Sequence, residues 1–492
     1  MNTDPSHMPR QNQGGTSCDN DHTPTGRDAA LPPAGAGMPP TLLGRLAGSP
    51  LLPLGTLSLV GFPAGSARAN WFSFFNAVSW QIALGAPVIL YAQKLGANDA
   101  LLGLLAALQP LLATLQVPGA HLLPRFGYRR VMVWGWAART VMLFVLASAP
   151  LWLASHGARL GAILMCLAGF NLFRGLTGGA WMPWITELIP QAVRGRFFSQ
   201  QQIFGMVGSL LALGMVSLLL AGRPGAGQFS LAILLSAIGG AISVFFLAGT
   251  PDLSTPQARR RAGARVPWLA MIRFKPFQRL SIFNILFALL LGGLGVFTVA
   301  FLRGVAGFSE SAVVLLSAMS VIGGLLSLLW SGPLLDHISA RAIIRLGVLV
   351  MGLICAGWWI LATRAVGHPL VLVGALYLLS GIAGIHITVA NLRLQTMVIP
   401  IMGRNHFFAL FTVVTALAGA ASPLAWGLLL SALGSIHRQT GGFVWNRYCI
   451  CFAGAALLCL PLLWYCRRLI ETAQPGALIT GAREGDAALP AK

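Results

Sequence analysis

A few polar side chains interrupt the long apolar runs of this 492-residue sequence, and their types could do chemistry. Arg174 lies within the apolar run 161–186, and Asn171 precedes it by three residues, which places both on one face of a helix. A buried arginine binds an anion or a polar group through its planar fork of donors, or it ties its helix to carbonyl groups of a neighbour. The sequence leaves ligand contact and packing equally open for Arg174.

Further candidate ligand contacts lie in other apolar runs, and an interhelical hydrogen bond is the alternative role for each asparagine. Asn76 and Trp80 share a helix face because they are four residues apart. These further candidates are Asn76, Trp80, Gln81, Asn284 and His386.

The positions of the acidic residues limit what the substrate can be. The chain has twelve Asp and Glu residues, and none lies near the middle of a predicted helix. His386 is therefore the only mid-helix side chain whose ordinary pKa suits proton transfer. A cationic substrate would find no buried counter-charge, so a substrate that meets Arg174 is expected to be neutral or anionic.

Other function classes lack the residues that they need. The sequence contains no His-Glu-x-x-His, no Gly-x-Ser-x-Gly and no acidic pair in an apolar run, so we expect no enzyme. The seven cysteines show no metal-ligand spacing, and neither a metal nor a cofactor is expected. A channel would need a pore-lining ring or a filter loop, and neither is evident.

The apolar runs that carry the polar candidates are long enough to cross a membrane. The chain is 56% hydrophobic and 9% charged, whereas a soluble chain has about 25% charged residues. A bilayer span takes about 20 apolar residues, and runs without period-two alternation are expected to be helices. The twelve predicted helices are about 71–92, 99–118, 131–153, 161–186, 203–221, 229–249, 278–302, 311–331, 343–363, 370–395, 407–433 and 446–466.

Arginine and lysine gather in alternate loops between these helices. The richest run, at 259–275, follows the sixth predicted helix. Because cytoplasmic loops carry the excess of Lys and Arg, both termini and this run are predicted to be cytoplasmic in a multi-pass protein of a bacterial inner membrane. The net charge of +21 is thereby explained by topology and by contact with anionic lipid, with no nucleic acid as partner.

The sequence also repeats itself. "IPQAVRGRFF" at 189–198 matches "IPIMGRNHFF" at 399–408, and "SFFN" at 73–76 matches "SIFN" at 281–284. Two six-helix halves in the same orientation are typical of secondary transporters, whose binding site lies between the halves. The predicted divisions are a disordered tail at 1–69, a first half at 70–249, a basic linker at 250–276, a second half at 277–470 and a tail at 471–492.

Loop motifs carry a resemblance to a known family. "GPLLDHISAR" fits the pattern Gly-x-x-x-Asp-Arg/Lys-x-Gly-x-Arg, and "RGLTGGA" from Arg174 resembles an Arg-then-small-residue motif. The chain thus resembles the major facilitator superfamily, in particular bacterial members with Trp-x-x-Trp before "RGRFF", here Trp181 and Trp184. The corresponding loop after the second helix has Pro124 in place of the acid. The candidate gating residues in the two loops are Arg125, Gly127, Arg129, Arg130, Gly332, Asp336 and Arg341.

The resemblance implies an all-α integral membrane fold of twelve transmembrane helices in two pseudo-symmetric halves. It implies a monomer that moves a small molecule by alternating access, with a proton or sodium as the coupling ion. Helices 1, 4, 7 and 10 line the cavity in this family, and each carries one of the polar candidates. Asp336 paired with Arg341 is implied to close the cytoplasmic side, a plain loop ion pair being the alternative. A flippase for lipids or amphiphiles, a drug exporter and a non-transporting sensor stay open on the same fold.

Overall fold

Twelve helices of the described chain are long and apolar enough to cross a membrane, as the sequence predicts. The computed structural model describes residues 62–190, 193–252, 273–335, 338–398, 404–434, 436, 438–440 and 443–471. The tail at 1–61, most of the basic linker and the tail from 472 lie outside the described residues. The first helix begins at Ala67, slightly before the predicted half.

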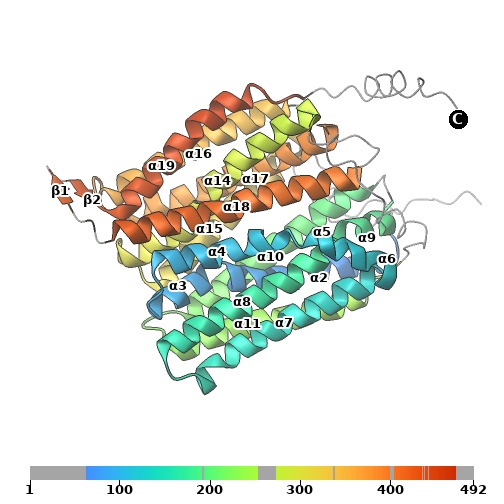
Figure 1. Ribbon diagram of the computed structural model, residues 1–492, viewed down its shortest axis with the longest axis horizontal. Coiled ribbons are helices and arrows are strands. Elements are labelled where there is room, and N and C mark those ends of the chain that lie inside the picture. The colour runs from blue at the N-terminus through green and yellow to red at the C-terminus, as the bar shows by residue number, and fades with distance from the viewer. Residues whose placement is uncertain are drawn as a thin grey trace, which may run out of the picture. The chain divides into compact units, whose positions relative to one another are not determined.

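The first half of the bundle is the lower set of helices in Figure 1, coloured blue to green. Its elements are α2 (Ala67–Leu84), α3 (Ala86–Lys94), α4 (Asp99–Ala113), α5 (Gln116–Gly119), η2 (Ala120–Leu122), α6 (Leu123–Phe126), α7 (Tyr128–Trp152), α8 (His156–Gly178), α9 (Trp181–Leu188), α10 (Arg194–Leu219) and α11 (Ala226–Ala248).

The second half repeats the pattern and adds a short hairpin. Its elements are α14 (Lys275–Gly304), α15 (Glu310–Leu335), α16 (Ala340–Ala362), α17 (Leu370–Val398), α18 (Arg404–Leu433), β1 (Arg438–Thr440), β2 (Phe443–Trp445) and α19 (Arg447–Cys466). The two strands pair antiparallel, with Arg438 opposite Trp445.

Two of the predicted spans are divided in the structure. Gly85 is extended (φ −96°, ψ −163°) and separates α2 from α3, and a Cβ there would meet the Gln81 carbonyl oxygen at 2.2 Å. The fourth span ends as α8 at Gly178, and α9 starts only at Trp181. Arg174 therefore lies four residues before the end of α8, although it is near the middle of the predicted apolar run 161–186.

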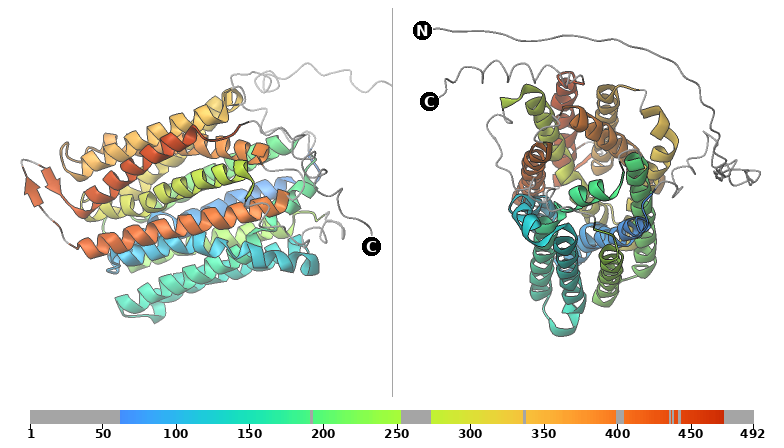
Figure 2. Two further views of the ribbon diagram at one scale, coloured as in Figure 1. Left: turned by 45° about the horizontal axis from the view of Figure 1, so that its top comes forward. Right: turned by 90° about the vertical axis from the view of Figure 1, so that its right-hand side faces the viewer.

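The two halves meet along α4 with α18 and along α10 with α15. Figures 1 and 2 show α4 beside α18 where the blue and orange helices meet. Small residues allow this approach, because a Cβ on Gly103 would meet the Pro423 carbonyl oxygen at 2.2 Å and the Gly427 Cα at 3.1 Å. Close packing of this kind drives helix association in lipid, where burial of apolar surface contributes little.

The bundle has two ends that are named here for their features. The hairpin end holds β1 and β2, the end of α3 and the start of α4, and the linker end is where α11 ends and α14 begins (Figure 1). Asp99 and Glu310 both lie in the first turn of a helix at the hairpin end, where negative charge suits the helix dipole. The repeat thus places equivalent carboxylates at one end of both halves.

Candidate functional site

A cavity of about 250 Å³ lies inside the first half among α2, α4, α7 and α8. Since Gln116 opens α5 and Gly178 closes α8, the cavity is nearer to the linker end than to the hairpin end. Its polar lining residues are Ser73, Asn76, Gln109, Gln116, Asn171 and Arg174, and its aromatic lining residues are Phe72, Trp136 and Trp181. Among the described residues, none that lines the cavity is acidic. The first half of the repeat thus holds a polar cavity with a cation in its wall.

Asn76 is held in one orientation by two donors. Its Oδ1 accepts a hydrogen bond from Trp136 Nε1 at 3.1 Å and another from an Arg139 guanidinium nitrogen. Because both partners are donors only, the amide oxygen must face them. The Asn76 NH₂ group is left to face elsewhere, and Asn76 itself lines the cavity.

Arg139 is a functional candidate that the sequence reasoning missed. It is 1% exposed, and its guanidinium lies over the rings of Trp136 and Phe170, at 4.6 and 4.9 Å from their centroids. Its Nε has no hydrogen-bond partner among the described residues. The signal was an arginine inside the apolar run 131–153, three residues after a tryptophan, but the third helix is not one of those that line the cavity in the resembling family.

Asn171 and Arg174 both face the cavity, as their shared helix face predicts. Asn171 is 1% exposed and donates from Nδ2 to the Leu167 carbonyl oxygen at 2.9 Å, and its Oδ1 has no partner within the described ranges. Arg174 makes no hydrogen bond or ion pair with any residue in the described part of the chain. Its donors are therefore available to a ligand.

Asn284 and His386 lie in the second half and do not line this cavity. Asn284 and Asn391 exchange amide hydrogen bonds of 3.0 and 2.6 Å between α14 and α17. His386 Nδ1 lies 2.7 Å from the Ile382 carbonyl oxygen and 3.3 Å from Ser327 Oγ. The asparagine pair is thus the interhelical hydrogen bond that the sequence left open as its alternative role.

Trp80 and Gln81 lie farther along α2 than the cavity does. Trp80 is 38% exposed, and Gln81 is half-buried. Neither side chain lines the cavity. The geometry therefore groups Asn76, Asn171 and Arg174 and leaves the other sequence candidates apart.

The first candidate gating loop is organised within its own half. Gly127 has φ +80°, a left-handed conformation that favours glycine, and joins α6 to α7. Arg129 donates to the Ala248 carbonyl oxygen at the end of α11, and Arg125 lies over the Phe126 ring at 5.3 Å. Arg130 is exposed.

The second candidate gating loop has an acidic partner that the sequence did not indicate. Asp336 lies outside the described residues, Gly332 lies in α15, and Arg341 pairs with Glu471 at 3.2 Å. Burial by itself raises the pKa of Glu471. Hydrogen bonds from Ser339 Oγ (2.6 Å), the Ala340 N–H and Arg341, together with the charge of Arg341, lower it by more. The pKa of Glu471 therefore lies below its ordinary value. The contact joins α16 to the segment that follows α19, the last helix.

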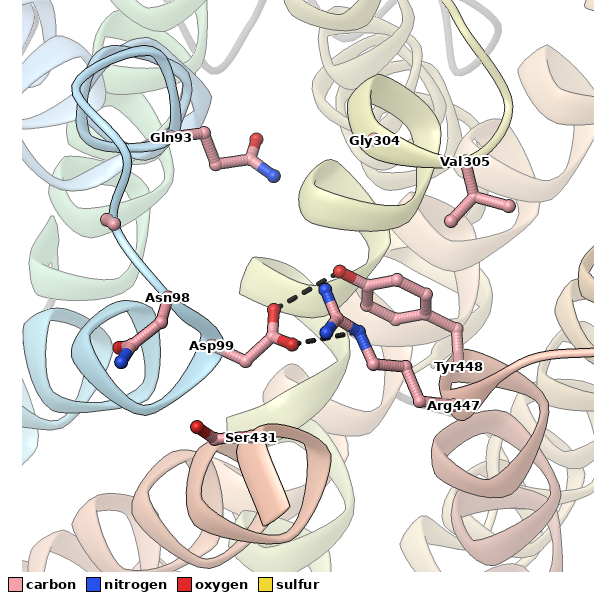
Figure 3. Close-up of a pocket in the computed structure, with 9 residues that line it drawn as sticks. Gln93, Asn98, Asp99, Gly304, Val305, Ser431, Arg447 and Tyr448 are labelled. Atoms are coloured by element: carbon pink, nitrogen blue, oxygen red, sulfur yellow. Dashed lines mark hydrogen bonds and ion pairs between the residues drawn. The ribbon is translucent and has the colours of Figure 1, made fainter. Parts of the chain in front are cut away.

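Asp99 joins the two halves at the hairpin end, which the sequence also did not indicate. Its Oδ2 lies 3.0 Å from Arg447 Nε, and its Oδ1 accepts from Tyr448 Oη at 3.2 Å (Figure 3). The carboxylate is 4% exposed and borders a pocket of about 340 Å³. These three residues are called the Asp99 cluster below.

Other contacts position and reinforce the Asp99 cluster. Asn446 accepts from the Tyr448 N–H at 3.0 Å and donates to the Ala362 carbonyl oxygen at 2.7 Å, which fixes the start of α19. Gln93 donates to the Ala300 carbonyl oxygen at 3.3 Å, and Ser217 Oγ lies 3.0 Å from Ser311 Oγ, both across the halves. The hairpin end is therefore closed by polar contacts between the halves.

Comparison with known proteins agrees with this architecture. The Major Facilitator Superfamily model matches residues 70–423. A D-xylose-proton symporter aligns at TM-score 0.67 and 14% identity, over 84% of this chain and 98% of that chain. The nucleoside transporter NupG aligns at TM-score 0.57 and 14% identity, over 84% and 100%. A POT family transporter in complex with a thioalcohol-conjugated peptide aligns at TM-score 0.63 and 15% identity, over 83% and 97%. None of the curated proteins matches the chain in sequence.

Proposed function

This chain belongs to the Major Facilitator Superfamily, and we propose that it is a secondary-active transporter of a small neutral or anionic solute. A proton or sodium gradient would drive the solute across the membrane. The chain is a multi-pass integral membrane protein. The excess of Lys and Arg in the linker-end loops favours a cytoplasmic location for that end, and we propose a monomer in a bacterial inner membrane.

The cavity of the first half is the observation that carries this proposal. It presents several amide groups and the Arg174 guanidinium, which has no hydrogen-bond or ion-pair partner in the described part of the chain. No carboxylate of the described residues lines it. A cationic solute would meet repulsion from Arg174 with no compensating charge. A neutral polar solute or an anion would instead gain hydrogen bonds from donors that are already in place. Two structural neighbours are named for D-xylose and for nucleosides, which are neutral polar solutes.

Alternating access is supported by the contacts at the hairpin end. Asp99 and Ser217 of the first half contact Arg447, Tyr448 and Ser311 of the second half. These contacts are short-range and polar, so they would break if the halves rocked apart at that end. We propose that the structure represents the state closed at the hairpin end, and that the opposite state lacks these contacts.

Reconstitution tests the proposal. The full-length protein is first screened by thermal shift against neutral and anionic metabolites, because a ligand of the folded state raises the melting temperature. Each binder is then followed as a radiolabelled solute into proteoliposomes, with and without a proton or sodium gradient. We expect saturable uptake of at least one binder. Binding without flux would favour the sensor, and movement of fluorescent lipid between leaflets without solute flux would favour the flippase.

A further inference from the structure

We infer that the cavity of the first half is an anion site that binds a carboxylate through Arg174 and the Asn76 amide, with Arg139 behind them. The inference rests on the proposed function, and it narrows the solute from "neutral or anionic" to an organic anion. Arg174 and Asn76 line the cavity, whereas Arg139 is fully buried behind the lining residues Asn76 and Trp136, both of which it contacts.

Asn76 transmits the positive charge of Arg139 to the cavity. Trp136 and Arg139 both donate to its Oδ1, so the amide dipole is aligned with its positive NH₂ end away from them. An amide polarised by a cation on its oxygen is a stronger donor from its nitrogen. The cavity wall therefore presents two kinds of donor to a ligand, the Asn76 NH₂ and the Arg174 guanidinium.

The charges around the cavity favour an anion. Arg139 is 1% exposed, and its contacts within the described chain are one neutral amide oxygen and two aromatic faces. The charge of Arg174 acts on it with the same sign. Burying a charge without an ionic partner is costly, and two neighbouring guanidinium groups increase the cost. A carboxylate in the cavity would offset both charges and accept the bidentate fork of Arg174.

The walls of the cavity indicate the rest of the ligand. Phe72 and Trp181 line it with their rings 4.9 Å apart, and Trp136 lines it as well. Aromatic walls favour a planar apolar body. The cavity volume of about 250 Å³ corresponds to about eight water molecules at ~30 Å³ each. A small aromatic carboxylate fits this combination of size, charge and surface.

The experiment measures anion binding without transport. The full-length protein in detergent is titrated with benzoate, benzamide and chloride at constant sodium, with isethionate as the balancing anion. We expect benzoate to raise the melting temperature with saturation and benzamide, its neutral analogue, to leave it unchanged. Arg174→Gln should abolish the benzoate shift. Arg174→Lys should raise the apparent Kd for benzoate at least about tenfold, because Lys lacks the planar fork. Arg223→Gln, an exposed arginine of the same half, is the matched control and should keep the full shift.

A second variant keeps the inference testable if the Arg174 variants fold poorly. Asn76→Asp has nearly the same shape and places a carboxylate against Arg139. We expect it to raise the melting temperature in isethionate buffer and to lose the benzoate shift, because the site then contains its own anion. A folded Asn76→Asp protein that is less stable than the wild type and still binds benzoate would overturn the inference.

The responses to chloride and benzamide, and the comparison with solute flux, test the anion site separately from transport. A chloride shift as large as that of benzoate, and in competition with it, would overturn the assignment of an organic carboxylate and identify an inorganic ion as the occupant. Equal shifts with benzamide, a benzoate shift that survives in Arg174→Gln, or no shift with any of the anions would overturn the inference. Flux of a neutral solute without an anion response would leave the transporter proposal standing and remove the anion site. An anion response without flux of any solute would leave the anion site standing and remove the transporter proposal.

Discussion

The Asp99 cluster gives the sharpest test of how the two halves move. Asp99 is 4% exposed, forms an ion pair with Arg447 at 3.0 Å and accepts a hydrogen bond from Tyr448 at 3.2 Å. Asp99→Asn keeps the size of the side chain and removes its charge. The change acts on the state closed at the hairpin end, because these contacts join residues of different halves. We expect it to shift the population toward the state that is open there.

The size of the shift follows from the burial of the partners. Removing one member of a fully buried ion pair costs about 3–5 kcal/mol. The Arg447 side chain is 34% exposed, so water recovers part of that loss, and the substituted amide still accepts a hydrogen bond. A net loss of about 1–3 kcal/mol changes the ratio of the two states by about 5- to 150-fold.

Cysteine labelling measures this ratio. Ser217 is 6% exposed and contacts Ser311 across the halves at the hairpin end, so a cysteine introduced at position 217 reacts with a maleimide chiefly when that end opens. Ser217→Cys is made in a background from which the native cysteines are removed, and the labelling rate is compared with and without Asp99→Asn. We expect the rate to rise by the factor given above.

The internal repeat supplies a matched control. Glu310 is equivalent to Asp99, is equally buried, and pairs with Arg303 of its own half at 2.8 Å. Glu310→Gln therefore removes a buried charge from the same end without breaking a contact between the halves. The reasoning is refuted if Asp99→Asn leaves the labelling rate at position 217 unchanged, or if Glu310→Gln raises it to the same extent.

Three further predictions concern packing, pH and topology. Asn391→Ala leaves the buried Asn284 oxygen without its donor and should destabilise the protein by about 1–3 kcal/mol, whereas the double alanine variant should cost less than the sum in a thermal-melt cycle. Because the pKa of Glu471 is lowered in the folded state, its contribution to stability is present above its ordinary pKa of 4.5 and is lost as the pH falls through the lower folded value. The melting temperature of Glu471→Gln should therefore lie below that of the wild type at neutral pH, and the two should converge in acid. Ala262→Cys in the basic linker should react with an impermeant maleimide in inside-out vesicles and not in intact cells, and labelling from outside would invert the topology.

The fold was predictable because membrane helices satisfy their own backbone groups. Each apolar run had to be a helix whatever its neighbours did, so the number of spans and the repeat were readable from the sequence alone. Boundaries shifted where the continuous helix is interrupted, at Gly85 and after Gly178. Composition alone reads both spans as continuous, since a hydropathy pattern does not report the local backbone angles.

Pairings between distant residues were not predictable. Asp99 and Arg447 are 348 positions apart, and Arg341 and Glu471 are 130 apart. Nothing local indicates that either pair meets, because the partners come together only when the helices are packed. Arg139 was visible as a charge in an apolar run, but its importance depends on Asn76 and Phe170, which lie on other helices.

The polar side chains of the two halves differ in whether they have partners within the protein. The polar candidates of the second half have protein partners: Asn284 is paired with Asn391, and His386 contacts Ser327. In the first half, Arg174 has no partner within the described residues, and Arg139 has no carboxylate partner there. We therefore expect an anion to bind the first half, where the arginine charges lack an acidic partner among the described residues. We expect α4 to contribute to the coupling between binding and movement, because it carries Asp99 at its start and Gln109 of the cavity about three turns later.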